Sequence, residues 1–334
     1  MASEVDGPRA LVCNPERAER RVREMDGSRT MQQPLTIDQG GVPVNVALLG
    51  TGLLGQAVAD RLQSTGHRLT AYNRSEEKTR SLQQRGVRIA ATAAEAMSGA
   101  KVVLLLLADA AAIRSVLFNP ATTAAVQGRT MIQMGTIGPA ESRALQEKIE
   151  RFGGHYLEAP VLGSIAEAQA GALLIMVGGT PEQYAEFVPL LHALGSEVQL
   201  IGPAGKAAGL KLALNQLIAA EMAAFSLSLG LVRREGVAVE SFMGILRKSA
   251  LYAPMFDKKL ARLTGRNYEK PNFSTSHMLK DVELFINAAE SAHLATGGLQ
   301  GVRSLFLRAI AQGLGSVDYS ALYEAIDPAE DHQP

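Results

Sequence analysis

The apolar positions of the chain follow one pattern before about residue 205 and another pattern after it. In the first part, short apolar runs typical of β-strands alternate with longer stretches typical of helices. The expected strands are 44–49, 68–72, 102–107, 130–134, 155–157, 173–177 and 198–201, and the expected helices are 53–65, 76–85 and 139–152. Because these strands are almost continuously apolar, we expect a parallel sheet covered by helices on both faces.

After Gly205 the strand pattern stops, and a helical pattern of about 30 residues runs to about Arg234, a length of about 45 Å. This helix is apolar almost all round but carries Glu221, so we expect it to be covered by protein rather than to span a membrane. Further helices are expected at 239–249, 256–263, 275–292 and 298–312. The pattern predicts an α/β domain at 44–203 and an all-helical domain at 204–330, joined by a long interdomain helix and preceded by an extension, 1–43.

Composition narrows the partners and the compartment. The 334 residues include 33 basic and 33 acidic side chains, so bulk charge favours neither nucleic acid nor a membrane surface as a partner. The single cysteine, Cys13, excludes an internal disulfide, and no Cys/His cluster suggests a metal, so we expect a reducing, cytoplasmic setting. The extension lacks the apolar block of a secretory signal and is too acidic for a mitochondrial transit peptide, and we expect it to be mobile.

A glycine-rich loop lies directly between the first expected strand and the first expected helix. It comprises Gly50, Thr51, Gly52, Leu53, Leu54 and Gly55, in the pattern GxGxxG. The first glycine permits a tight turn, the second lets the backbone approach a pyrophosphate, and the third allows close packing of helix on strand. The free N–H groups at the helix N-terminus favour phosphate. The loop predicts a Rossmann dinucleotide-binding domain, and the alternative is a glycine-rich turn without a ligand.

The turn after the second expected strand indicates which dinucleotide binds. An NAD enzyme usually places an acidic residue there to bind the ribose 2′-hydroxyl. This chain has Asn73, Arg74 and Ser75, with Lys78 close behind. A guanidinium pairs well with a 2′-phosphate, and the other three side chains add donors without repelling it. We therefore expect NADPH rather than NADH, the alternative being a solvated polar turn.

The candidate catalytic group is Lys211, which lies with Asn215 on one face of the long apolar helix. Burial disfavours an ammonium and lowers its pKa, which makes a lysine a better general acid. Hydride addition to a carbonyl builds negative charge on oxygen, and Lys211 would donate a proton to that oxygen while Asn215 orients the amine. The alternative is a lysine whose ammonium extends into solvent from the first turns of the helix.

The segment 158–164, with the sequence EAPVLGS, follows a strand and leads into small residues. Backbone N–H groups at Gly163 and Ser164 would suit a substrate carboxylate, although a glycine turn without a ligand explains the composition almost as well.

These patterns together resemble the β-hydroxyacid dehydrogenase family. The glycine loop, the NRS turn with its following lysine, and the KxxxN pair Lys211 and Asn215 match the family in order and spacing. The segment 158–164 is similar to the family's DAPVSGG substrate signature, and Phe273, Lys280 and Asp281 match its FxxxxxxKD pattern. The resemblance covers residues 44 to about 328.

The resemblance implies roles that the residues alone do not indicate. Phe273 would pack on the substrate, Asp281 would help to order it, and Lys280 would lie near the cofactor. Their ordinary alternatives are a core aromatic residue and an ion pair on a helix surface. Leu107, Ala108 and Asp109 would form the loop on the nicotinamide side.

Two departures from the family pattern remove hydroxyls that face the substrate. Gly135 and Thr136 stand where the family usually has Ser-Thr, and Leu162 replaces the serine of DAPVSGG. Thr136, which the resemblance places beside both cofactor and substrate, and Ser164 would partly compensate for the loss. We expect a less polar pocket than that of a tartronate semialdehyde reductase or a 3-hydroxyisobutyrate dehydrogenase. The sequence is more similar to the glyoxylate and succinic semialdehyde reductase branch.

The sequence thus predicts an NADPH-dependent reductase of small aldehyde or keto acids, with Lys211 as the general acid and no metal. We expect a homodimer or homotetramer because the long helix is so apolar. Alternatives are a 3-hydroxyisobutyrate or tartronate semialdehyde type of dehydrogenase, an NADP-linked imine reductase, and a non-enzymatic NADP-binding scaffold. Lys211 and Asn215 favour carbonyl chemistry over these last two.

Overall fold

The computed structural model describes residues 43–329 of the chain. Almost all of the expected N-terminal extension, residues 1–42, lies outside the described residues, as do residues 330–334. The expectation that the extension is mobile, and the expectation based on Cys13, therefore stay predictions.

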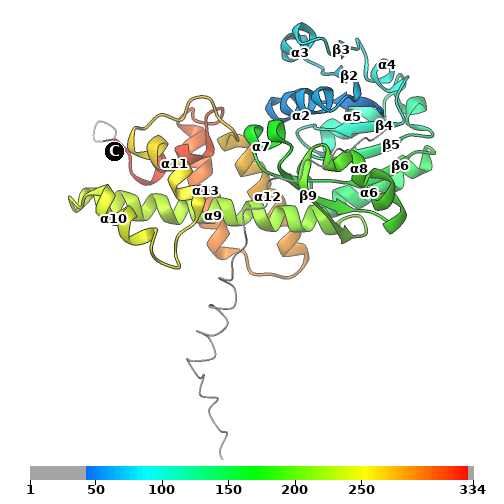
Figure 1. Ribbon diagram of the computed structural model, residues 1–334. Coiled ribbons are helices and arrows are strands. Elements are labelled where there is room, and N and C mark those ends of the chain that lie inside the picture. Colours follow the sequence, from blue (N-terminus) through cyan, green and yellow to red (C-terminus); the bar gives the residue numbers. More distant parts are fainter. Residues whose placement is uncertain (1–42, 330–334) are drawn as a thin grey trace, which may run out of the picture. The chain divides into compact units, whose positions relative to one another are not determined.

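The first part of the described chain forms a nine-stranded sheet in the order β3-β2-β1-β4-β5-β6-β8-β7, with β9 paired to β8 (Figure 1). The strands are β1 (Asn45–Leu49), β2 (Arg68–Tyr72), β3 (Arg88–Ile89), β4 (Val102–Leu105), β5 (Thr130–Gln133), β6 (His155–Glu158), β7 (Val161–Leu162), β8 (Leu173–Gly178) and β9 (Gly195–Gly202). The arrangement of β1 to β6 is that of a doubly wound dinucleotide-binding sheet, whose ligands bind beyond the carboxyl ends of the strands.

The expectation of a parallel sheet is right for β1 to β6, which pair parallel with their neighbours, and wrong for two later strands. Strand β8 pairs antiparallel with β6 and β7, and β9 pairs parallel with β8. A parallel return needs a crossover of about a dozen residues or more. The connection from β7 to β8 contains only the short helix α7 (Ile165–Ala170), so the chain returns in the opposite direction.

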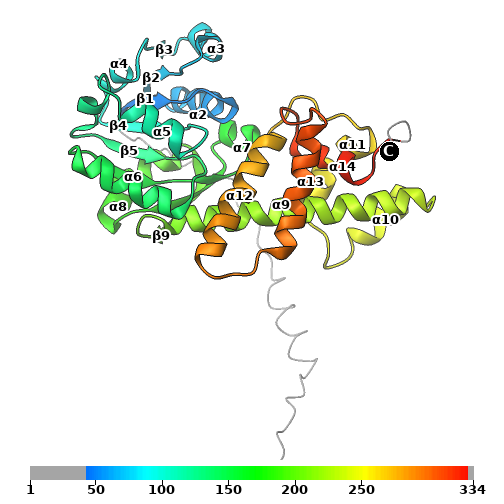
Figure 2. The same cartoon turned by 180° about the vertical axis from the view of Figure 1, so that it is seen from behind.

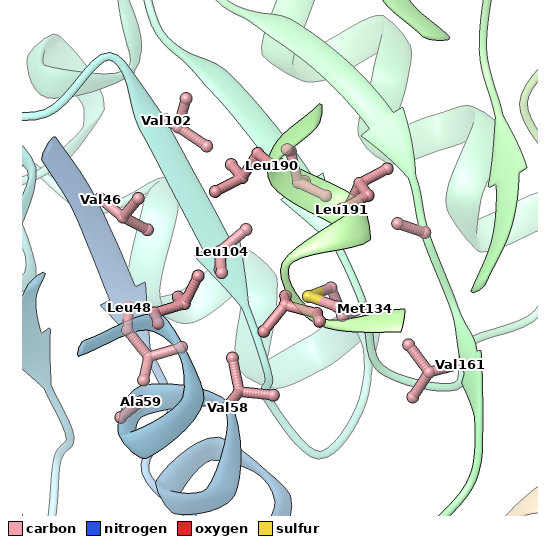
Figure 3. Packing of buried hydrophobic residues seen from close by; sticks show 14 of the residues in the cluster. Val46, Leu48, Val58, Ala59, Val102, Leu104, Met134, Val161, Leu190 and Leu191 are labelled. Atoms are coloured by element: carbon pink, nitrogen blue, oxygen red, sulfur yellow. The ribbon is translucent and has the colours of Figure 1, made fainter. Parts of the chain in front are cut away.

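Helices cover both faces of this sheet because the strand side chains alternate between two cores. Val46 and Leu48 of β1 belong to one buried cluster, and Ala47 and Leu49 belong to the other. Figure 3 shows the first cluster, in which Leu190 of α8 packs beside the β-strand residues. The side chains of parallel strands buried on both faces explain why the sequence of the strands is almost continuously apolar.

The helices of this part lie between the strands in the sequence. They are α2 (Leu53–Ser64), α3 (Arg80–Gln84), α4 (Ala93–Met97), α5 (Ala110–Leu117), α6 (Pro139–Arg151), α7 and α8 (Pro181–His192), with short 3-10 helices η1 (Glu76–Lys78) and η2 (Thr123–Val126). The single helix expected at 76–85 is in fact two segments, η1 and α3. They are divided at Thr79, whose hydroxyl donates a hydrogen bond to the Glu76 carbonyl at 2.7 Å.

The second part is helical and is organised around α9 (Lys206–Arg234). The other helices are α10 (Val239–Leu246), α11 (Pro254–Thr264), α12 (Thr275–Ser291), α13 (Gly297–Ala311) and α14 (Leu322–Ile326), with the 3-10 helix η3 (Tyr319–Ala321). Figure 2 shows α12 and α13 crossing α9, and their apolar side chains share one buried cluster with those of α9.

Within residues 43–329, α9 is the one helix that is long and apolar enough to cross a membrane by length and composition alone. Core helices of globular proteins pass the same test, and α9 packs against α12, α13 and α14. Its buried positions include Lys211 and Asn215, whereas Leu210, Leu217, Leu227 and Leu231 are exposed.

Candidate active site

The glycine loop has the geometry of a phosphate-binding turn. Gly50 has a φ of 107°, and a Cβ there would lie 2.3 Å from the Leu106 carbonyl oxygen. A Cβ on Gly55 would lie 2.2 Å from the Gly50 carbonyl oxygen, whereas a Cβ on Gly52 would meet nothing within 4 Å. Gly52 also begins α2 with no side chain capping the helix. The loop therefore leaves the N–H groups of α2 open to a ligand phosphate.

The turn after β2 is tied to the glycine loop by its own side chains. Asn73 accepts a hydrogen bond from the Thr51 N–H at 3.2 Å and donates one to the Ser75 carbonyl at 3.1 Å. The buried Thr51 hydroxyl donates to the Lys78 carbonyl at 3.0 Å. Asn73 and Thr51 thus shape the loop, and one of the two amide N–H groups of Asn73 is already engaged.

Arg74 and Lys78 have exposed side chains in this turn. Among residues 43–329, no hydrogen bond or ion pair engages the Arg74 guanidinium. An unpaired guanidinium beside a phosphate-binding loop fits a dinucleotide with a 2′-phosphate. The residues present therefore fit the expected cofactor, with the N-terminus of α2 suited to its pyrophosphate and Arg74 suited to its 2′-phosphate.

Lys211 is buried on α9, with 8% of its surface exposed. Its Nζ donates a hydrogen bond to Asn215 Oδ1 at 2.8 Å, one helical turn further on. Burial lowers the pKa of Lys211 to about 8, while Asp281 acts to raise this pKa and Lys280 acts to lower it. The alternative of an ammonium extended into solvent does not hold in this structure. An amine with this pKa can donate a proton near neutral pH and recover it from solvent.

Asn215 links Lys211 to α12. Its Nδ2 donates to Asp281 Oδ2 at 2.6 Å, and Asp281 is 1% exposed. The other carboxylate oxygen, Oδ1, lies 2.9 Å from Lys280 Nζ in an ion pair that lacks hydrogen-bond geometry. One polar chain, Lys211 to Asn215 to Asp281 to Lys280, therefore joins two helices.

Lys280 extends this chain to the carboxyl edge of the sheet. Its Nζ donates to the carbonyls of Ala108 at 3.0 Å and Thr136 at 2.8 Å, in the loops after β4 and β5. Asp109, next to Ala108, caps α5 by accepting the Ala112 N–H at 2.7 Å. Leu107 packs on the core near Gly50. Residues expected on the nicotinamide side are thereby joined to α9 and α12, the helices that carry Lys211 and Asp281.

The EAPVLGS segment is arranged differently from the expectation. The Ser164 N–H donates to Glu167 Oε2 at 2.8 Å, and the Ser164 hydroxyl donates to the same oxygen. These two hydrogen bonds hold the pKa of Glu167 at about 2. Ser164 therefore offers neither donor to a substrate carboxylate here. Gly163 has a φ of 140°, and Leu162 lies half-buried in β7.

The loop after β5 explains one of the missing hydroxyls. A Cβ at Gly135 would lie 2.8 Å from the Leu107 carbonyl oxygen, so this backbone path excludes the family's usual serine. Thr136 is half-buried, and within the described part of the chain its hydroxyl makes no hydrogen bond. Thr136 therefore remains the hydroxyl available to a ligand beside Lys280.

Phe273 packs within the helical part. Its ring lies edge-on to Tyr319, with centroids 6.3 Å apart, and 6.0 Å from the ring of His277. These contacts are those of a partly buried aromatic residue in the helical core. The expected packing of Phe273 on the substrate stays a prediction.

Two site residues were missed from the sequence. His277 lies three and four residues before Lys280 and Asp281, hence on the same face of α12, and its Nδ1 is 2.6 Å from Ser274 Oγ. Desolvation lowers the pKa of His277. Glu158 stands out in the sequence only as part of the EAPVLGS segment, yet it is buried against the start of α9, and burial raises its pKa. The spacing of His277 from Lys280 and Asp281 on one helix face is a signal that could have found it, whereas no local signal pointed to Glu158.

Two family descriptions match this chain. Residues 45–202 match the NAD binding domain of 6-phosphogluconate dehydrogenase. Residues 205–326 match the NAD-binding domain of NADP-dependent 3-hydroxyisobutyrate dehydrogenase. Together the two matches cover almost all of the described residues.

Among curated proteins, glyoxylate/succinic semialdehyde reductase 1 of Arabidopsis thaliana is 29% identical over 285 residues, 85% of this chain and 98% of that protein. Among solved structures, 3-hydroxyisobutyrate dehydrogenase of Salmonella typhimurium has a TM-score of 0.76 at 22% identity, over 84% of this chain and 99% of that one. An imine reductase of Myxococcus stipitatus in complex with NADP+ has a TM-score of 0.60 at 18% identity, over 85% and 100%.

The expected fold class is confirmed by these likenesses, since both structures share the sheet domain and the helical domain. The expected family is confirmed by the two matched descriptions and the curated relative. With the glycine loop, the buried lysine and these matches in agreement, the chain belongs to the β-hydroxyacid dehydrogenase family of NAD(P)-dependent oxidoreductases.

Proposed function

We propose that this protein is an NADPH-dependent reductase of small aldehyde or keto acids, of the glyoxylate and succinic semialdehyde type, with Lys211 as its general acid. The observation that carries the proposal is the buried Lys211 amine, hydrogen-bonded to Asn215 and with a pKa lowered to about 8. Burial of this kind lowers the pKa of a lysine toward neutral pH, where its ammonium transfers a proton more readily.

The chain offers defined sites for the cofactor. The α2 N-terminus opened by Gly52 would hold the pyrophosphate, and Arg74 with Lys78 would hold the 2′-phosphate. When bound, reduced nicotinamide supplies the hydride that the substrate carbon receives. The carbonyls of Ala108 and Thr136, fixed by Lys280, border the nicotinamide side.

Lys211 completes the reduction by proton transfer. As the carbonyl carbon gains hydride, the electron pair of the C=O π-bond moves to oxygen, and the Lys211 ammonium gives that oxygen a proton. The product is a hydroxy acid, and the amine, now neutral, recovers a proton from solvent. Asn215 Oδ1 accepts one hydrogen of the Lys211 amine and thereby orients the remaining hydrogens toward the substrate oxygen. The fixed positive charge also stabilises the developing alkoxide.

The segment 158–164 does not offer the Ser164 donors to the substrate carboxylate, because both donate to Glu167. We place the substrate carboxylate near the Thr136 hydroxyl, because Lys280 binds the carbonyl of the same residue and supplies positive charge there. The absence of hydroxyls at Gly135 and Leu162 favours an aldehyde acid without a second hydroxyl over tartronate semialdehyde. The Arabidopsis relative's name points to the same class.

The test is an NADPH-depletion screen with purified protein. Substrates would be glyoxylate, succinic semialdehyde, tartronate semialdehyde, methylmalonate semialdehyde and a cyclic imine, each with wild type and Lys211→Met. Turnover of glyoxylate or succinic semialdehyde that the variant loses supports the proposal. Preference for one of the other semialdehydes or for the imine would reassign the substrate, and NADPH binding without any turnover would indicate a scaffold.

A further inference from the structure

Helix α9, which carries the catalytic lysine, begins without a cap of its own. Its N-cap residue is Gly205, which has no side chain, and the first N–H groups of any helix need partners from outside it. Glu158 supplies those partners from the sheet. Its Oε1 accepts the Gly205 N–H at 2.6 Å, and its Oε2 accepts the N–H groups of Ala207 at 3.2 Å and Ala208 at 3.4 Å.

The Glu158 carboxylate is held firmly on the sheet side. Glu158 is the last residue of β6, paired with Gln133 of β5 and Gly178 of β8, and it is 1% exposed. The Ser142 hydroxyl donates to Glu158 Oε1, and Tyr156 Oη lies 2.7 Å from Ser142 Oγ. Because Ser142 gives its hydrogen to Glu158, Tyr156 donates to Ser142. Contacts from α6 and β6 thus fix the carboxylate independently of its hydrogen bonds to α9.

The neighbouring strand leaves room for this side chain. A Cβ on Gly178 would lie 2.1 Å from Glu158 Oε2, so no larger residue fits opposite the carboxylate. An aspartate at 158 is shorter by one methylene and would not carry its oxygens as far toward α9. The negative charge also complements the positive end of a 29-residue helix.

The cap controls the placement of Lys211 because a helix is stiff over so short a length. Lys211 follows Gly205 by six residues, which is about 9 Å along the axis. A shift of the start of α9 would move the Lys211 amine with it.

We propose that Glu158 is a positioning residue for Lys211, anchoring the first turn of α9 to the end of β6 and so fixing the amine relative to the cofactor-binding edge of the sheet. This inference rests on the proposed role of Lys211 and adds a determinant of that role from a different part of the fold. It predicts that loss of the cap damages proton transfer and leaves cofactor binding intact.

Two variants test it. Glu158→Gln keeps the size but replaces one acceptor oxygen with an NH2 group, and Glu158→Asp keeps the charge but shortens the reach. Each should lower kcat about tenfold to a hundredfold, since misplacement by about 1 Å has effects of this size. The KM and Kd for NADPH should stay within about twofold. Thr180→Ala, which removes a cap from α8, is the matched control and should lower Tm while kcat is unchanged.

A second measurement does not depend on turnover. Labelling of the Lys211 amine with acetic anhydride over a pH series, followed by mass spectrometry, reports its ionisation. In wild type the midpoint should be about 8. In the Glu158 variants it should move toward the ordinary value of a lysine because a loosened helix start admits water, and in Thr180→Ala it should not move.

An unchanged kcat and an unchanged labelling midpoint in folded Glu158→Gln and Glu158→Asp would overturn the inference and leave only a structural cap. Failure of wild type to reduce any aldehyde acid would instead refute the proposed function. The labelling experiment would still report whether Glu158 positions Lys211, since it does not depend on turnover. The two failures are therefore distinguishable.

Discussion

Replacing Lys211 with methionine should abolish turnover and stabilise the folded protein at pH 7. Methionine keeps the length and apolar stem of lysine, so the packing of α9 against α12 is retained. What disappears is an ammonium that is buried without a directly bonded carboxylate, since its bonded partner is the neutral amide of Asn215. Burial of such a charge opposes folding.

The magnitude follows from the pKa of Lys211, which burial lowers from 10.5 to about 8. Each pKa unit corresponds to about 1.4 kcal/mol, so folding with this charge costs about 3 kcal/mol below pH 8. This pKa already includes the attraction to Asp281 and the repulsion from Lys280, but the variant also loses the hydrogen bond to Asn215, about 1 kcal/mol. We therefore expect the free energy of unfolding to rise by about 1 to 2 kcal/mol.

The difference in the free energy of unfolding between Lys211→Met and wild type depends on pH in a defined window. Between about pH 8 and the ordinary pKa of lysine, the unfolded chain holds a proton on Lys211 that the folded chain releases. The stability of wild type therefore rises with pH across this window. The advantage of Lys211→Met should shrink over the same range and vanish above it.

The assay is urea denaturation of wild type and variant over a pH series, with NADPH depletion as the activity measurement. Lys259→Met is the matched control, because Lys259 is also buried but is bonded directly to Asp318 at 2.7 and 2.8 Å. Its removal leaves a buried carboxylate unpaired and should destabilise by about 3 kcal/mol or more. A Lys211→Met protein that is less stable at pH 7, or that retains turnover, would refute the reasoning.

Three further outcomes are expected. Arg74→Ala should lower kcat/KM for NADPH at least about tenfold with little change for NADH, measured by paired cofactor titrations, and equal losses would exclude a 2′-phosphate contact. Lys280→Met should lower kcat about tenfold and move the high-pH decline of kcat/KM to higher pH, because Lys280 lowers the pKa of Lys211. Leu217→Glu on the exposed stripe of α9 should reduce the mass found by light scattering if, as we propose, a second copy covers that stripe.

The elements that the sequence predicted well are those whose signal is local. The alternation of apolar positions, the GxGxxG loop and the bounds of α9 depend on residues that are neighbours along the chain. The contact of Lys211 with Asn215 belongs to the same class, because a spacing of four residues on a helix places the two side chains together.

Local signals failed where elements are very short or where direction is set by distant partners. Strands β3 and β7 have two residues each, too few for any periodicity, and β8 runs antiparallel because the connection before it is short. Ser164 illustrates the same limit at the site. Its donors looked free from composition, but Glu167 takes them in a capping arrangement.

The sequence by itself determined the dinucleotide loop and the helix that presents the lysine, because each depends on spacing within a short stretch of chain. It also determined the family, because the motifs follow one another in the family's order. Only the tertiary structure decided that Glu158 caps α9 from 47 residues away and that Lys280 bonds carbonyls of the β4 and β5 loops more than 140 residues away. Such contacts depend on how helices and sheet pack, and packing is settled by burial over the whole chain rather than by any local pattern.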